Sequence, residues 1–87
     1  MADQDTIRRQ VRDYILQEFL KGEPEDSLSN DMRLTKDGIL TSIDNIKLVA
    51  FLEKTYGIVI EAHEVVGGPL DTVDSITSTV LGKIEAK

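Results

Sequence analysis

The middle of the chain holds a hydroxyl-bearing turn that opens an apolar helix, in the stretch Gly38-Ile39-Leu40-Thr41-Ser42-Ile43-Asp44-Asn45-Ile46-Lys47-Leu48-Val49. The spacing predicts a helix from Ser42 to Tyr56 that ends at Gly57. Thr41 or Ser42 supplies its N-cap, and Asp44 is well placed in its first turn. We therefore expect the Ser42 hydroxyl at a helix N-terminus, where unpaired N–H groups favour a phosphate ester.

The apolar residues of this helix are too many for one face. One row should meet the core and contains Leu48, Val49, Leu52 and Tyr56. A second row begins beside Ser42 and contains Ile43, Ile46 and Ala50. Because a surface helix normally has one apolar face, the second row predicts a further contact, either within the chain or with a partner protein.

An amphipathic helix is predicted near the N-terminus, with Asp5 or Thr6 as its cap and with Gly22 and Pro24 ending it. Its apolar residues recur at helical spacing and are Ile7, Val11, Tyr14, Ile15 and Phe19. Its polar residues are expected on the other side and include Arg8, Arg9, Arg12, Asp13 and Gln17. Helical periodicity therefore defines the buried face of this segment.

Residues 22–41 form a long polar connection, and loops of this length in small domains are often functional. We expect its apolar residues to turn inward and hold the loop against the domain, with one short helical turn; they are Leu28, Met32, Leu34, Ile39 and Leu40. Such a loop would be part of the folded structure.

The C-terminal third is predicted to be helical, because the run Gly57-Ile58-Val59-Ile60 has no second strand to pair with. We interpret this run as a buried connection into a short helix around residues 61–66, followed by a break at Gly67-Gly68-Pro69. Thr72, followed by Ser75 at the capping spacing, opens a last helix of about residues 73–83, which points inward with Val73, Ile76, Val80, Leu81 and Ile84. The sequence thus predicts one all-α domain spanning residues 1–87.

Composition narrows the classes of function. The net charge of −6 argues against a nucleic-acid binder, whose affinity comes from Lys and Arg on phosphates. There are no cysteines, which excludes disulfides and Cys nucleophiles. No signal peptide or bilayer-spanning apolar run is visible, so a cytoplasmic protein without membrane insertion is expected.

The machinery of an enzyme is sparse. His63 is the only histidine, and without cysteine it has few partners for a metal site. The spacing of Ser42 and His63 does not support a catalytic triad. The carboxylates between the first two helices do not follow the alternation of a calcium loop; they are Glu23, Glu25, Asp26 and Asp31. We therefore predict that the chain is not an enzyme and holds no metal.

Four motifs in this order resemble the acyl carrier proteins. Gly-x-x-x-Ser-Ile-Asp occupies 38–44, Leu-Val-x-x-Leu-Glu occupies 48–53, Tyr-Gly-Ile-x-Ile occupies 56–60, and Thr-Val-Asp-Ser-Ile occupies 72–76. Each motif alone is weak, but together with the amphipathic helix and the long loop that precede them the resemblance covers nearly the whole chain.

The resemblance implies an antiparallel bundle of three longer helices plus a short third helix. It also implies that a phosphopantetheinyl transferase attaches 4′-phosphopantetheine from coenzyme A to Ser42. The arm would carry an acyl, aminoacyl or polyketide intermediate as a thioester from a loading enzyme to downstream synthases or transferases, with the carrier itself a monomer. The implied partner-docking residues are Thr41, Ile43, Asp44, Ile46, Lys47, Ala50 and Lys54.

The chain departs from the family pattern around the serine. The family usually has Asp before it and Leu after it, whereas Thr41 and Ile43 stand here. Lys47 and Lys54 replace the usual Glu, which weakens attraction to basic partners of the housekeeping fatty-acid pathway. Phe51 is larger than usual and is expected to narrow the groove for a long acyl chain. These departures indicate a specialised carrier, as in secondary metabolism.

Two other interpretations remain open. One is an interaction module of the same fold without a prosthetic group, in which Ser42 acts only as the helix N-cap. The other is a small hydrolase using Ser42, which the absence of an apparent general base disfavours. The cargo, the loading enzyme and the pathway stay open.

Overall fold

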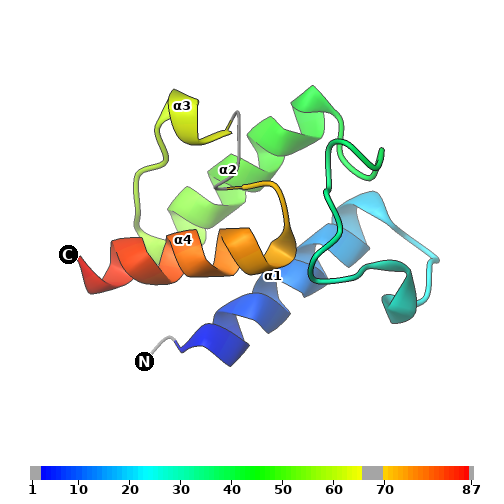
Figure 1. Cartoon of the computed structure of the whole chain (residues 1–87), viewed down its shortest axis with the longest axis horizontal. Helices are drawn as coiled ribbons and strands as arrows, with labels where there is room; N and C mark the ends of the chain where they lie inside the picture. The colour runs from blue at the N-terminus through cyan, green and yellow to red at the C-terminus, as the bar shows by residue number, and fades with distance from the viewer. Residues whose placement is uncertain (1–2, 66–69, 87) are drawn as a thin grey trace.

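The computed structural model describes residues 3–65 and 70–86 and consists of helices joined by loops (Figure 1). The elements are α1 (Gln4–Phe19), a 3-10 turn η1 (Glu25–Ser27), α2 (Ser42–Tyr56), α3 (Ala62–Val65) and α4 (Val73–Glu85). No strand occurs in these two ranges, which confirms the all-α prediction. The radius of gyration of 12.0 Å is that of a compact chain of this length.

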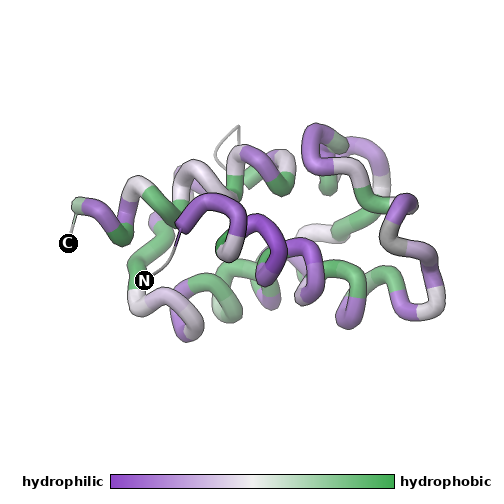
Figure 2. Tube along the Cα trace, turned by 90° about the horizontal axis from the view of Figure 1, so that it is seen from below, coloured by the Kyte–Doolittle hydropathy of each residue, from purple (hydrophilic) through white to green (hydrophobic). Residues whose placement is uncertain are grey.

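The core lies between α1, α2 and α4. α1 and α4 cross each other and form the most extensive contact between helices, and α2 covers them from one side (Figure 1). Fully buried side chains from the three helices are Ile7, Val11, Ile15, Leu48, Leu52, Val73, Ile76 and Val80. Along the helices, hydrophobic residues recur with hydrophilic residues between them (Figure 2). The inward faces predicted from periodicity are therefore confirmed, with Val49, Tyr56, Leu81 and Ile84 packed at the edge of the core.

The loop between α1 and α2 folds onto the domain as predicted. Leu28, Leu34 and Leu40 are almost completely buried, and Met32 and Ile39 are half-buried. The Leu34 backbone accepts hydrogen bonds from the N–H groups of Ile39 and Leu40. Its own N–H donates to the carbonyl of Asp71, at 2.8 Å. The loop is thereby fixed directly before α2.

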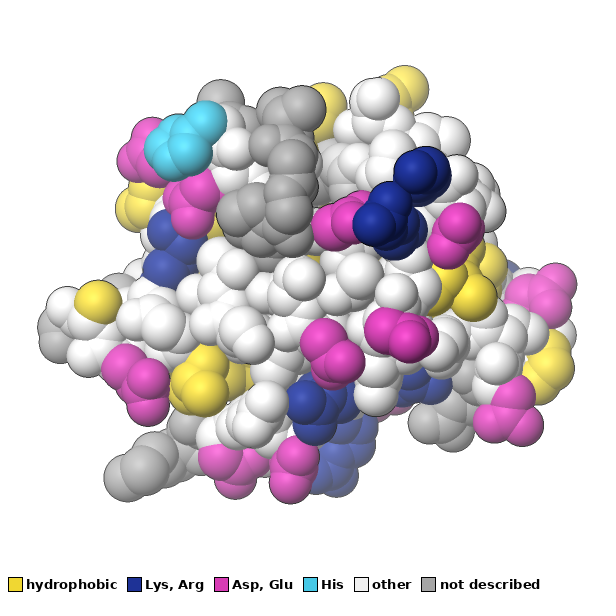
Figure 3. Space-filling model, viewed as in Figure 1, with side chains coloured by type: hydrophobic (Ala, Val, Ile, Leu, Met, Phe, Trp, Pro, Cys, Tyr) yellow, Lys and Arg dark blue, Asp and Glu magenta, His cyan; other side chains and the backbone are white. Residues whose placement is uncertain are grey.

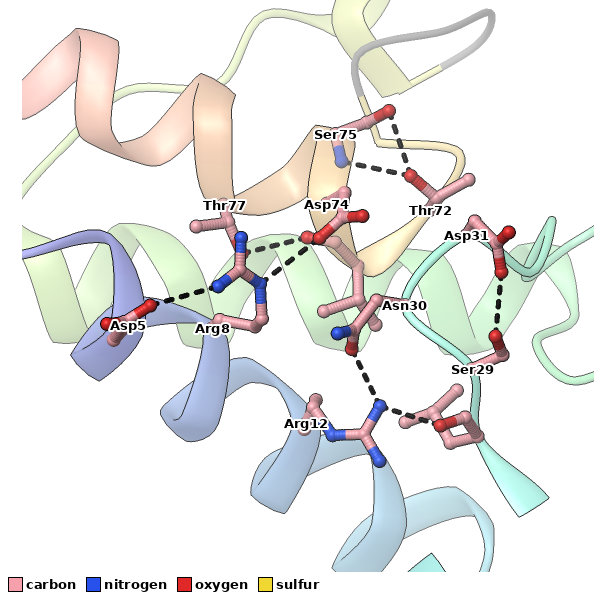
Figure 4. Close-up of polar contacts among 12 residues, drawn as sticks. Asp5, Arg8, Arg12, Ser29, Asn30, Asp31, Thr72, Asp74, Ser75 and Thr77 are labelled. Carbon is pink, nitrogen blue, oxygen red and sulfur yellow. Dashed lines mark hydrogen bonds and ion pairs between the residues drawn. The ribbon is translucent and has the colours of Figure 1, made fainter. Parts of the chain in front are cut away.

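Two arginines of α1 lie elsewhere than predicted. Arg8 and Arg12 were expected on the solvent side, yet both are half-buried. Arg8 points toward Asp74, and Arg12 points toward Asn30 (Figure 4). Arg8 pairs with Asp74 of α4 at 3.1 Å. Nη1 of Arg12 donates to the carbonyl of Leu28 at 2.6 Å and to the side chain of Asn30 at 2.7 Å. These arginines tie α1 to α4 and to the loop, because their long stems reach across the helix surface.

Several helix ends differ from the predicted positions. α1 is capped by Asp3 and not by Asp5 or Thr6, because the Asp3 carboxylate accepts the N–H of Thr6 at 2.8 Å. That hydrogen bond lowers the pKa of Asp3. α1 ends at Phe19, before Gly22, and α4 continues to Glu85, beyond the predicted end at residue 83. The short predicted helix around residues 61–66 is present at Ala62–Val65, whereas the predicted break at residues 67–69 lies outside the described residues.

The segment between α2 and α3 is a buried connection, as predicted. Ile58 and Ile60 are buried while Val59 between them is exposed. The Ile60 N–H donates to the Glu53 carboxylate at 2.9 Å, so this carboxylate holds the connection against the end of α2. Gly57 ends the helix with a φ of 64°, a left-handed conformation that favours glycine.

Across residues 3–65 and 70–86, no helix has the length and apolar character required to cross a membrane. On the face seen in Figure 3, acidic side chains are scattered over the surface and lie next to the basic ones. This face presents no broad basic area of the kind that binds nucleic-acid backbones.

Candidate functional site

The N-cap of α2 is Thr41. Its backbone is extended, with a φ of −87° and a ψ of 176°. Its hydroxyl accepts the N–H of Asp44 at 3.1 Å, and the Asp44 carboxylate accepts the N–H of Thr41 at 3.0 Å. This reciprocal pair is a capping box, which satisfies two N–H groups at the start of the helix. The interpretation of Ser42 as the N-cap is therefore wrong.

Ser42 is the first residue of α2, and its side chain is exposed. Within the described part of the chain its hydroxyl makes no hydrogen bond, since Thr41 and Asp44 carry out the capping. The hydroxyl lies at the positive end of a helix of 15 residues, which stabilises negative charge placed there. Ser42 is thus held at a fixed position by the helix while its hydroxyl remains available to a reagent.

A groove of about 410 Å³ begins at Ser42. Its walls come from α2, from the loop before α2, from the end of α3, and from the residues just before α4. The lining residues are Thr35, Ser42, Asn45, Ile46, Val65, Leu70 and Asp71. The side-chain amide of Asn45 donates to the Thr35 hydroxyl at 2.9 Å, which ties the loop to α2 at the rim. A group attached to Ser42 would therefore start at the edge of a mixed polar and apolar groove.

The second apolar row of α2 is exposed. Ile43 and Ile46 each keep 67% of their surface accessible, and Ala50 is exposed as well. Lys47 and Lys54 lie beside them and are also exposed. Of the seven predicted docking residues, Thr41, Ile43, Ile46, Lys47, Ala50 and Lys54 are exposed, whereas Asp44 is half-buried in the capping box.

Phe51 does not line the groove that contains Ser42. That it narrows the groove for a long acyl chain stays a prediction. The Phe51 ring stacks on Tyr14 of α1 with a centroid distance of 3.9 Å and an interplanar angle of 11°. Tyr14 also meets Phe19 edge-on and donates to the carbonyl of Lys47 at 3.2 Å. Burial, with the nearby charges of Glu18 and Asp44, raises the pKa of Tyr14. Phe51 therefore joins α2 to α1.

No catalytic arrangement is visible in the part of the chain that the structure describes. His63 is exposed on α3, and among the described residues no hydrogen bond or ion pair joins it to Ser42. No group of three His, Asp or Glu side chains in these residues could hold a metal ion. The described residues place an exposed serine at the start of α2, among the residues that line the groove.

No protein-family model matches the chain, and no curated protein matches it significantly. The resemblance to the acyl carrier proteins therefore rests on the motifs in the sequence, and the geometry at Ser42 is independent of it.

Proposed function

We propose that the chain is a carrier protein with a 4′-phosphopantetheine arm on Ser42, attached by a separate phosphopantetheinyl transferase from coenzyme A. The protein would be a cytoplasmic monomer whose helices form the antiparallel carrier-protein bundle. It would present acyl, aminoacyl or polyketide intermediates to a loading enzyme and to downstream synthases or transferases. It has no catalytic activity of its own in this proposal.

One observation carries the proposal: Ser42 is exposed at the start of α2, its hydroxyl makes no hydrogen bond to the described residues, and the adjacent Thr41 caps the helix. A serine that served as the cap would have to use one oxygen for both the helix N–H and the ester. Here the two tasks belong to different residues, so modification leaves the capping box of Thr41 and Asp44 intact. The fixed helix start also holds the acceptor at a constant position for a transferase.

The surroundings of Ser42 suit a phosphodiester-linked arm. The positive end of α2 stabilises the phosphate, an effect of about 0.3–1 kcal/mol at an exposed helix end. The groove offers Asn45, Thr35 and Asp71 for hydrogen bonds, with Ile46, Val65 and Leu70 for apolar contact. When bound, the arm supplies the thiol that this chain lacks and carries its cargo as a thioester. The residues of the chain orient and partly shield that arm.

The exposed lysines of α2 support assignment to a specialised pathway rather than to general fatty-acid synthesis. Lys47 and Lys54 make the outer side of the helix less attractive to basic enzyme surfaces. A competition assay tests this point with fatty-acid synthase enzymes and a standard acyl carrier protein. Poor turnover of this chain is expected, and turnover equal to that of the standard carrier would contradict the assignment.

The second candidate is an interaction module of the same fold that carries no prosthetic group. The exposed row of Ile43, Ile46 and Ala50 favours it as much as it favours a carrier. In this alternative Ser42 acts as the N-cap of α2, but Thr41 performs that task. This alternative therefore leaves the exposed Ser42 hydroxyl without a role.

Intact-protein mass spectrometry separates the two candidates. The chain is incubated with coenzyme A and a transferase of broad specificity, and then with several others. A mass gain of one phosphopantetheine is expected for the wild type and for Thr41→Ala, and no gain for Ser42→Ala. Absence of any gain with all the transferases would favour the interaction module.

A further inference from the structure

The outer side of α2 forms one continuous stripe. At about 100° per residue, five side chains fall within an arc of about 100° on the side opposite Leu48 and Leu52. We call them the outer stripe, which consists of Ile43, Ile46, Lys47, Ala50 and Lys54. All five are exposed. The stripe therefore presents an apolar strip, with Ile43 and Ile46 each 67% accessible, next to two cationic side chains.

Among the described residues, the carboxylates of α2 form no ion pair with the lysines of this stripe, and each accepts a backbone N–H instead. Asp44 lies three residues before Lys47, but its Oδ2 accepts the N–H of Thr41. Glu53 adjoins Lys54, but its Oε2 accepts the N–H of Ile60. Both carboxylates are half-buried. Within the described residues, the ammonium groups of Lys47 and Lys54 form neither ion pairs nor hydrogen bonds.

We propose that the outer stripe docks a partner protein whose contact surface is apolar at the centre and carries carboxylates at the positions facing Lys47 and Lys54. Exposed isoleucines supply the contact area, and the two lysines select the charge of the partner. The physiological meaning rests on the proposed carrier function, since Ile43 directly follows Ser42 and a partner on the stripe would lie beside the arm. The contact itself requires no modification of Ser42.

Two electrostatic effects of opposite sign act on such a partner. The net charge of −6 repels an acidic protein at long range, whereas the lysines attract its carboxylates at contact. At physiological ionic strength the screening length is about 8 Å, so charges spread over the molecule are largely screened. The dimensions of the chain are 36 × 26 × 20 Å, well beyond that length. Contact charges therefore decide the selectivity of the stripe at physiological salt.

A pair of helical peptides tests the proposal. Both have the same Leu face, and the residues flanking that face are Glu in one peptide and Lys in the other. Each is titrated into the unmodified ¹⁵N-labelled chain at physiological salt, and amide shifts are followed. We expect the Glu-flanked peptide to bind about fivefold more tightly, as two exposed ion pairs allow, with shifts centred on Ile43 to Lys54.

Charge reversal provides the matched comparison. The double variant Lys47→Glu/Lys54→Glu should reverse the preference. Arg9→Glu/Lys21→Glu changes the net charge equally at exposed positions outside α2 and should retain the wild-type preference. Circular dichroism verifies that both variants remain folded.

Several results would overturn the proposal. They are equal binding of the two peptides, preference for the Lys-flanked peptide, binding of neither, or shifts centred away from the stripe. Shifts of the stripe that depend on protein concentration without any peptide would identify a second copy of the chain as the occupant. Because these titrations use the unmodified chain, their failure leaves the mass-spectrometric result on Ser42 unaffected, and the reverse also holds.

Discussion

Replacing each of two adjacent hydroxyl residues by alanine should have opposite consequences. Thr41→Ala removes the oxygen that accepts the N–H of Asp44 at 3.1 Å and thus breaks the capping box of α2. Ser42→Ala removes a hydroxyl that makes no hydrogen bond in the described residues. We predict that the first substitution lowers stability and preserves the acceptor, whereas the second preserves stability and abolishes modification.

The magnitudes follow from the two positions. Loss of a Thr cap costs about 1 kcal/mol. In a domain of this size, that corresponds to a decrease in Tm of about 4–8 °C. Ser42 is the exposed first residue of the helix and not its cap, and alanine has the higher helix propensity by a few tenths of a kcal/mol. Ser42→Ala should therefore leave the free energy of unfolding unchanged or raise it slightly.

Urea unfolding followed by circular dichroism measures both variants, with Thr41→Ser as the control that keeps a capping hydroxyl. Thr41→Ser should match the wild type, because serine caps helices at least as well as threonine. The reasoning would be refuted if Ser42→Ala lost as much stability as Thr41→Ala, since Ser42 would then be the cap.

Three further substitutions test the way the loop and α3 are held. Leu34→Ala should lower the free energy of unfolding by about 2–5 kcal/mol in urea unfolding, because the side chain is fully buried; a loss below 1 kcal/mol would show that the loop does not belong to the core. Arg12→Ala should cost about 1–3 kcal/mol by leaving the half-buried carbonyl of Leu28 without its charged donor, and hydrogen exchange should rise around the loop first. The N–H of Glu61 and the ammonium of Lys83 lower the pKa of Glu64 from its ordinary value of 4.5. The ionised Glu64 carboxylate therefore contributes to folding stability above pH 4.5, and this contribution is lost as the pH falls through the lower pKa of the folded state. Glu64→Gln should thus flatten the acidic limb of stability against pH, and an unchanged slope would contradict the assignment.

The buried faces could be predicted because helical periodicity determines them directly. Ile7, Val11 and Ile15 share one side of a helix wherever that helix packs. The inward turn of Leu28 and Leu34 was predictable as well, since isolated leucines in a polar loop lower the free energy by joining the core.

The choice between Thr41 and Ser42 as the cap was harder, because both precede the same apolar helix. The deciding signal was present in the sequence: an acidic residue follows Thr41 by three positions, which is the capping-box spacing. The positions of Arg8 and Arg12 could not be predicted in this way. Their partners, Asp74 and the Leu28 carbonyl, are brought near only by packing between distant segments.

The most direct test of the account is fragmentation mass spectrometry of the chain after incubation with coenzyme A and a transferase. This measurement locates the added group among the neighbouring hydroxyls of the helix start. The account predicts one phosphopantetheine on Ser42 and none on Thr41, whose hydroxyl is committed to the N–H of Asp44. A group on Thr41, or no group with any transferase, would contradict the central claim that Ser42 is the attachment site.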